Sequence, residues 1–147
     1  FIDWRQIPAL TDCIQEVGLL WQGIGSWAKP SGFYRPRLGG MAQSCEFIVW
    51  GSSGDSLVEK SKFIAGDFKE PINKTTKNPF HPAQKPISVL REILKLSKET
   101  DLIFDPFMGS WTTARACMDL GRNFIGAELS PEYCEVGRNR LKQQVLI

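Results

Sequence analysis

Apolar residues recur with two different spacings along the second half of the chain. Between residues 87 and 98 they lie three or four positions apart, which is the spacing of one face of a helix. Two short continuous apolar runs instead fit buried strands. The pattern therefore predicts, in chain order, a helix over Ile87–Lys98, a strand over Leu102–Phe104, a helix over Thr112–Leu120, a strand over Phe124–Gly126 and a helix over Pro131–Gln144.

The first half of the chain also alternates between strand-like and helix-like segments. Pro8 suits the first turn of a helix and Gly18 suits its end. The predicted elements are a strand over Phe1–Arg5, a helix over Ile7–Val17, strands over Leu19–Trp27 and Cys45–Trp50, and loops over Lys29–Gly40 and Asp55–Asn78. Alternation of this kind predicts an α/β fold with a mostly parallel sheet and helices on both faces.

Composition narrows the class of protein. A length of 147 residues with 42% hydrophobic content predicts one domain with a single core. The cysteines are scattered without a C-x-x-C pair, and His81 is the only histidine, so we predict no structural metal. Separated thiols suit a reducing cytoplasm. No apolar run approaches the roughly 20 residues of a membrane span, and no signal peptide is recognisable.

A glycine turn between a strand and a helix is the strongest chemical signal. Gly109 lacks a Cβ, so its backbone can approach a ligand, and the N–H groups that begin the next helix are unpaired donors. Ser110, Thr112 and Thr113 add hydroxyls, and Asp105 ends the preceding strand. The alternative is an ordinary turn with an N-capping serine or threonine.

A second acid favours the ligand site over the ordinary turn. Glu128 comes just after the next predicted strand, 19 residues beyond Gly109, which is the spacing at which an α/β sheet sets an acid against ribose hydroxyls. Carboxyl ends of parallel strands meet at one edge of a sheet, so two strand ends would converge on one nucleotide-like cofactor.

Three motifs then resemble the DNA amino-methyltransferases, which methylate N6 of adenine or N4 of cytosine. Residues 105–113, Asp-Pro-Phe-Met-Gly-Ser-Trp-Thr-Thr, resemble that family's Asp-Pro-Phe-x-Gly-Ser-Gly-Thr-Thr cofactor signature. Residues 81–86 resemble its His-Pro-x-Gln-Lys-Pro segment, and residues 124–133 resemble its Phe-Ile-Gly-x-Glu…Tyr tail. Their order matches the permuted type, in which target-base motifs precede the cofactor motif. Residues 1–6, 27–30 and 45–52 are similar to the middle strands of such enzymes, particularly of phage and prophage members.

The resemblance implies a Rossmann-like methyltransferase fold that binds S-adenosylmethionine and acts on a base flipped out of double-stranded DNA. Asp105 and Phe107 would border the methionine and adenosine moieties, Gly109 would allow close approach, Glu128 would bond the ribose hydroxyls and Lys85 would lie near the methionine carboxylate. The candidate cofactor-binding residues are His81, Gln84, Lys85, Pro86, Asp105, Pro106, Phe107, Gly109, Ser110, Thr112, Thr113, Glu128 and Leu129.

The family's acceptor tetrapeptide, Asp/Asn/Ser-Pro-Pro followed by an aromatic residue, does not occur in these 147 residues. We therefore expect the carboxyl-terminal portion of a methyltransferase, with the sheet incomplete at its amino end and no catalytic residue of its own. Residues 1–54 would supply the middle strands, 55–80 a basic polar loop, and 81–147 the cofactor-binding part of one domain. The alternative is a noncatalytic phage protein of the same fold that binds DNA, cofactor or a host defence protein.

Net charge is only +2, but basic residues gather in one stretch. Residues 29–77 hold eight lysines and arginines against five acids. The aromatic rings of Phe33 and Tyr34, next to Arg35 and Arg37, could stack on bases. We predict DNA contacts, against the alternative of ordinary solvated loops, for Lys29, Arg35, Arg37, Lys74 and Lys77.

Two expectations follow from departures from the family pattern. Trp111 stands where the family has glycine, so its indole either clashes with the cofactor or packs under a helix. A strand at Phe1 with no neighbour would leave an unpaired edge, which favours self-association or pairing with an amino-terminal part.

We expect a location in the cytoplasm of a bacterium or of a phage-infected host.

Overall fold

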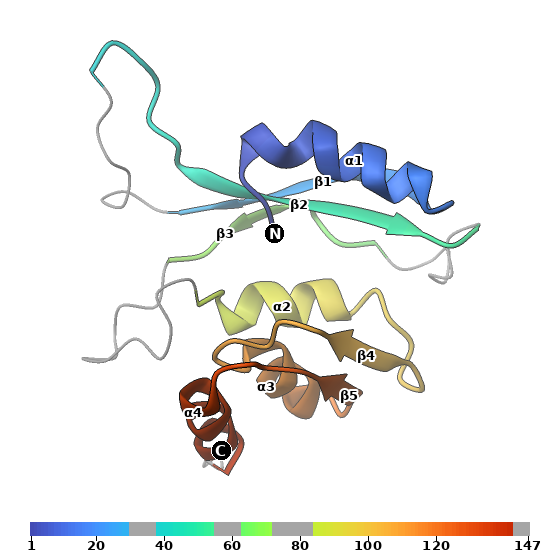
Figure 1. The fold of residues 1–147 in the computed structure, drawn as a ribbon, viewed down its shortest axis with the longest axis vertical. Coiled ribbons are helices and arrows are strands. Elements are labelled where there is room, and N and C mark those ends of the chain that lie inside the picture. The colour runs from blue at the N-terminus through green and yellow to red at the C-terminus, as the bar shows by residue number, and fades with distance from the viewer. Residues whose placement is uncertain (30–37, 55–62, 72–83, 143–147) are drawn as a thin grey trace. The chain divides into compact units, whose positions relative to one another are not determined.

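The computed structural model describes residues 1–29, 38–54, 63–71 and 84–142. These residues form two compact units, Phe1–Pro71 and Ile72–Ile147. Each unit has its own sheet (Figure 1). The organisation of 1–147 as one domain stays a prediction.

The first unit is a three-stranded sheet covered by one helix. Helix α1 (Ile7–Glu16) precedes strands β1 (Leu20–Ala28), β2 (Cys45–Ser52) and β3 (Asp67–Lys69), in the sheet order β2-β1-β3. Strands β1 and β2 are antiparallel, and β1 and β3 are parallel. Strand β3 lies inside the segment predicted as loop, and three residues with one buried position are too few to show a period in the sequence.

The predicted strand over Phe1–Arg5 is wrong. Ile2 alone makes a bridge, donating to the Phe47 carbonyl at 2.8 Å and accepting from the Phe47 N–H at 3.0 Å. The Asp3 carboxylate then accepts from the Arg5 N–H at 3.0 Å and starts the short 3₁₀ helix η1 (Trp4–Gln6). Local capping therefore turns the chain away from the sheet after one pair. Self-association through this segment stays a prediction.

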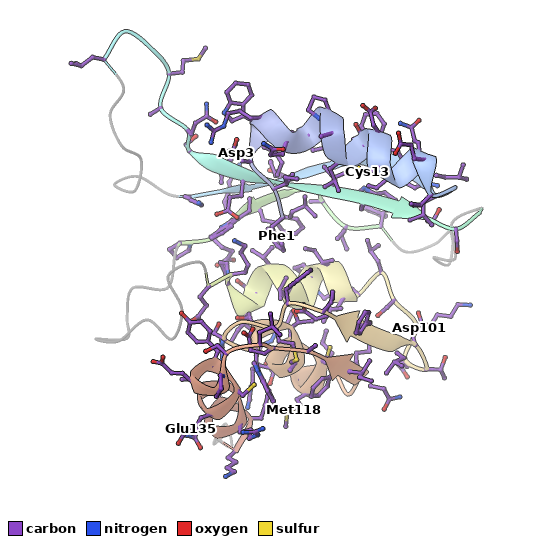
Figure 2. The ribbon with its side chains drawn as sticks, viewed as in Figure 1. Phe1, Asp3, Cys13, Asp101, Met118 and Glu135 are labelled. Atoms are coloured by element: carbon purple, nitrogen blue, oxygen red, sulfur yellow. The ribbon has the colours of Figure 1, made fainter. Side chains whose placement is uncertain are left out.

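Trp27 is the largest fully buried side chain of the first unit. Its indole Nε1 donates to the Glu70 carbonyl at 2.8 Å, which ties β1 to the end of β3. The ring of Phe1, labelled in Figure 2, meets the indole edge-on with centroids 6.5 Å apart. Such a pair adds to the area that both rings bury. Trp27 therefore joins the first residue, the central strand and the end of the shortest strand.

The second unit holds the predicted strand–turn–helix–strand segment. Strand β4 (Leu102–Asp105), helix α3 (Thr112–Asp119) and strand β5 (Asn123–Gly126) form a parallel β-α-β unit. Helix α4 (Pro131–Lys142) follows β5. The bounds of these four elements lie within two residues of the predicted ones, and the parallel pairing is confirmed.

Helix α2 (Ile87–Leu94) is shorter than predicted and packs on α3. The Ser97 hydroxyl donates to the Leu94 carbonyl at 2.7 Å, which ends the helix four residues early. Small residues on α3, Ala114 and Ala116, are fully buried and allow a close approach. Asp119 of α3 accepts from Arg91 of α2 at 2.9 Å, so an ion pair also joins the two helices.

Within the described ranges, no helix has the length and apolar character needed to cross a bilayer. The same residues contain no group of three side chains that would ligate a metal. All four cysteines are free thiols, and Cys13, labelled on α1 in Figure 2, is exposed. Cys117 on α3 is fully buried, and burial raises the pKa of its thiol.

We predict that Trp27→Phe lowers the free energy of unfolding by about 1–3 kcal/mol, because it removes the bond to the Glu70 carbonyl and opens a cavity. Trp50→Phe is the matched control, since Trp50 on β2 is 40% exposed. It should change the free energy by less than about 0.5 kcal/mol. Urea unfolding followed by circular dichroism measures both, and equal losses would contradict the role given to Trp27.

Candidate cofactor site

The carboxyl ends of β4 and β5 are joined by backbone hydrogen bonds beyond the strands themselves. The Ala127 N–H donates to the Asp105 carbonyl, and the Met108 N–H donates to the Ala127 carbonyl, both at 3.0 Å. The Met108 side chain lies over Gly126, where a Cβ would overlap its sulfur. Glycine at position 126 therefore lets the chain after β4 cross closely over the end of β5.

Glu128 binds the glycine turn through its carboxylate. Its Oε2 accepts from the Gly109 N–H at 2.7 Å, and its Oε1 accepts from the Ser130 N–H at 2.9 Å. Hydrogen bonds to an ionised acceptor are stronger than neutral ones. The acid predicted at this spacing thus lies against Gly109, as expected for two converging strand ends.

Asp105 organises the other side of the same turn. Its Oδ2 accepts from the Thr113 hydroxyl at 2.6 Å, and its Oδ1 accepts from the Phe107 N–H at 3.0 Å. These bonds link the end of β4 to the first turn of α3. They also hold a carboxylate at the strand end, where it favours a cationic group on a ligand.

Two large apolar side chains beside these acids are exposed. Phe107 follows β4 and is 86% exposed, and Leu129 follows β5 and is 98% exposed. Flat apolar ligand groups are bound by side chains of this kind. The strand ends therefore present acids together with uncovered apolar surface.

Helix α3 begins without a capping side chain. Its N-cap residue is Trp111, and no side chain accepts a hydrogen bond from the first turn in the cap position. The serine or threonine cap of the alternative is therefore not found, and ligand binding by the turn stays a prediction. Trp111 has φ 58° and ψ 36°, the left-handed conformation that glycine adopts most readily.

The indole of Trp111 packs against α4. A Cβ on Gly137 would overlap three atoms of the indole ring, so glycine at that helical position makes room for tryptophan at the turn. Within the described residues, the indole Nε1 is buried and has no hydrogen-bond partner. Of the two possibilities raised by the sequence, the structure supports packing on a helix, and that helix is α4.

Arg140 of α4 binds the turn on either side of Trp111. One guanidinium nitrogen, Nη1, donates to the Ser110 carbonyl at 2.8 Å, to the Ser110 hydroxyl at 3.3 Å and to the Thr112 hydroxyl at 3.1 Å. Ser110, Thr112 and Arg140 are buried, with exposed fractions of 4–6%. Burial lowers the pKa of Arg140, but a guanidinium stays protonated at neutral pH.

The remaining predicted cofactor residues are placed as follows. Pro86 is the N-cap residue of α2, and Gln84 and Lys85 precede it, half-buried. His81 lies outside the described residues. Pro106 is exposed between Asp105 and Phe107. The structure thus brings together the residues of the turn and of the β5 end.

Of the predicted DNA-binding residues, Lys29 lies in the described part of the chain. Its ammonium pairs with Glu46 at 2.6 Å and lies 5.1 Å from the centre of the Trp27 ring. These contacts bind Lys29 to its own sheet. Arg35, Arg37, Lys74 and Lys77 lie outside the described residues, and their contact with DNA stays a prediction.

Sequence reasoning missed the contribution of α4. Arg140 reads as an ordinary charged residue near a helix end, because nothing local marks its burial. Gly137 carried a usable signal, since a glycine inside a helical pattern costs stability and usually has a packing reason.

The sequence is similar to those of known DNA methyltransferases. A family model described as DNA methylase matches residues 1–139. The orphan methyltransferase M.BamHII of Bacillus amyloliquefaciens is 44% identical over 68 residues, which are 46% of this chain and 26% of the relative. The type II methyltransferase M.BglI of Bacillus subtilis is 25% identical over 148 residues, covering 92% of this chain and 42% of the relative. The matched part is thus less than half the length of either relative.

Solved structures agree with the predicted fold class. The crystal structure of the M1.HpyAVI–SAM complex superposes with a TM-score of 0.81 and 29% identity, covering 97% of this chain and 72% of that one. The cytosine-N4-specific PvuII DNA methyltransferase superposes with a TM-score of 0.77 at 20% identity, covering 99% and 59%. The α/β, Rossmann-like methyltransferase fold is confirmed.

We predict that Gly137→Ala destabilises the protein by about 1–3 kcal/mol, because its methyl group overpacks against Trp111. The same change in a Trp111→Gly background should stabilise by up to about 1 kcal/mol, since alanine is the better helix former once the indole is gone. Urea unfolding of the four proteins gives the coupling energy. Additive effects would show that the indole does not depend on Gly137.

Proposed function

The chain belongs to the DNA methylase family, and on that premise we propose that it binds S-adenosylmethionine where β4 and β5 end, in the service of methyl transfer to an exocyclic amine of DNA. The observation that carries the proposal is the bond from the Gly109 N–H to the Glu128 carboxylate. It brings the two strand ends together with Asp105 at the start of the same turn.

The residues present fit the chemical groups of this cofactor. Asp105 offers a carboxylate to the methionine ammonium, and Glu128 offers one to the ribose hydroxyls. Phe107 and Leu129 offer exposed apolar surface that an adenine ring would cover. Lys85, Gln84 and His81 complete the set by resemblance to the family motif.

When bound, the cofactor supplies a methyl group on a sulfonium centre, so the protein itself provides binding, orientation and exclusion of water. Methyl transfer of this class to an exocyclic amine would need no cysteine nucleophile from the protein. Cys117 on α3 is fully buried, and burial raises the pKa of its thiol. The target is N6 of adenine or N4 of cytosine.

Double-stranded DNA is the proposed substrate. A base within a duplex must leave the stack to reach a cofactor. The basic stretch 29–77 would contact the phosphates, and such binding weakens as salt rises. We propose that the protein acts in the cytoplasm of a bacterium or of a phage-infected host, where such DNA would be its substrate.

Binding without catalysis by this chain alone is the second candidate. The 147 residues contain no Asp/Asn/Ser-Pro-Pro-aromatic tetrapeptide, which is the acceptor clamp of the family resemblance. A flipped base would then have nothing to hold it beside the cofactor. We propose that these residues bind cofactor and that the acceptor clamp lies outside them.

We predict that the chain binds S-adenosylhomocysteine or S-adenosylmethionine in calorimetric titration. Asp105→Asn and Glu128→Gln should each weaken binding roughly ten- to hundredfold, because each removes the charge from a hydrogen-bonded acceptor while keeping its shape. Asp101→Asn, before the opposite end of β4, and Glu135→Gln, exposed on α4, are matched controls that should leave affinity unchanged.

Absence of binding by the unmodified chain at millimolar cofactor would refute the cofactor site. Binding that survives both Asp105→Asn and Glu128→Gln would place the ligand elsewhere. Circular dichroism of every variant separates a lost ligand contact from a lost fold.

We predict no methyl transfer to DNA by this 147-residue chain, because orientation supplies up to about 7–11 kcal/mol of barrier lowering and the base would not be oriented. A tritiated-methyl assay on unmethylated genomic DNA tests this. Incorporation above background would show that an acceptor site exists within these residues, and Asn78→Ala would then test the Asn-Pro-Phe segment first.

A further inference from the structure

Arg140 makes three hydrogen bonds to the turn at residues 110–112. It lies near the end of α4, 28 to 30 residues beyond its partners, and donates to Ser110 twice and to Thr112 once. Arg140, Ser110 and Thr112 are buried together.

The bonds to Arg140 change the assignment of two predicted cofactor residues. Ser110 and Thr112 were expected to offer their hydroxyls to the ligand, but both are at most 5% exposed and both lie against the guanidinium. A hydroxyl buried against an internal cation is committed to that cation. Thr113, whose hydroxyl binds Asp105, remains on the side of the strand ends.

The turn needs an external support because its backbone is strained. Trp111 lies between the two residues that Arg140 binds, and a left-handed conformation is costly for any residue with a Cβ. Gly109, whose N–H binds Glu128, comes directly before this pair. A turn free to relax at 110–112 would move the Gly109 N–H away from the carboxylate.

We propose that Arg140 is a positioning residue of the cofactor site, which acts by holding the 110–112 turn so that the Gly109 N–H and the Glu128 carboxylate stay in register. Ser110 and Thr112 are acceptors for Arg140 rather than ligands of the cofactor. The inference rests on the proposed cofactor function and names how the same site is held.

The first test measures the turn without any ligand. Arg140→Met keeps the length and apolar stem of the side chain and removes its donors, and Arg138→Met changes an exposed arginine of the same helix as a control. In amide hydrogen exchange by NMR, Arg140→Met should raise the exchange rate of the Gly109 amide at least tenfold. The amides of the β4–β5 ladder should keep their rates, and Arg138→Met should change neither.

A uniform rise in exchange across Gly109 and the β4–β5 ladder would assign Arg140 a general structural role and overturn the proposal. An unchanged Gly109 rate in a folded Arg140→Met protein would overturn it as well. The exchange experiment needs no cofactor, so its result tests the role of Arg140 independently of the proposed function.

The second test measures S-adenosylhomocysteine affinity by calorimetry. Arg140→Met should weaken binding at least tenfold, and Arg140→Lys should restore part of the loss because an ammonium can still donate to these oxygens. Thr112→Val should weaken binding in the wild-type background and add nothing in the Arg140→Met background. Arg138→Met should bind as the unmodified chain does.

The outcomes separate the two claims. Failure of the unmodified chain to bind S-adenosylhomocysteine refutes the proposed function and leaves the exchange experiment to decide the role of Arg140. Binding by the unmodified chain together with equal binding by Arg140→Met refutes the positioning role alone. If Thr112→Val weakens S-adenosylhomocysteine binding as much in the Arg140→Met background as in the unmodified chain, Thr112 contacts the cofactor itself.

Discussion

The hydrogen bond from the Gly109 N–H to the Glu128 carboxylate is the constraint on which the site depends. It joins the turn after β4 to the end of β5, and each of its two ends is fixed separately. Backbone bonds through Ala127 fix the path after β5, and Met108 packs over Gly126. A hydrogen bond from a backbone N–H to a charged acceptor is shorter and stronger than one between neutral groups. The two acids of the site therefore have a fixed geometry before any ligand binds.

Helix α4 supports that geometry from outside the β-α-β unit. Gly137 leaves room for the indole of Trp111, and Arg140 binds the residues on either side of it. Tryptophan at a left-handed position costs conformational energy, which the buried packing and the hydrogen bonds offset. Tryptophan at position 111 is thus accommodated by a glycine on α4, 26 residues further along the chain.

The elements that the sequence predicted well are those with strong local signals. Helix α1, strand β2 and the β4-α3-β5 segment follow from apolar period and from glycine and proline positions, and strand β1 lies within one residue of its predicted bounds. The errors occur where one or two contacts decide. Asp3 caps a 3₁₀ turn where a strand was expected, and β3 is set by pairing with β1 and the burial of Phe68. Contacts between distant residues override weak local preference.

The residues Asp105, Gly109 and Glu128 were identifiable from sequence because strand–turn–helix order and a 19-residue spacing determine where strand ends meet. Only the tertiary structure decided what each side chain of the turn contacts. Ser110 and Thr112 carry the hydroxyls expected of a ligand site, yet both bind Arg140, because α4 folds back and buries its guanidinium against them. A buried charged side chain needs hydrogen-bond partners next to it. No local sequence pattern shows which distant charged residue will be buried against Ser110 and Thr112.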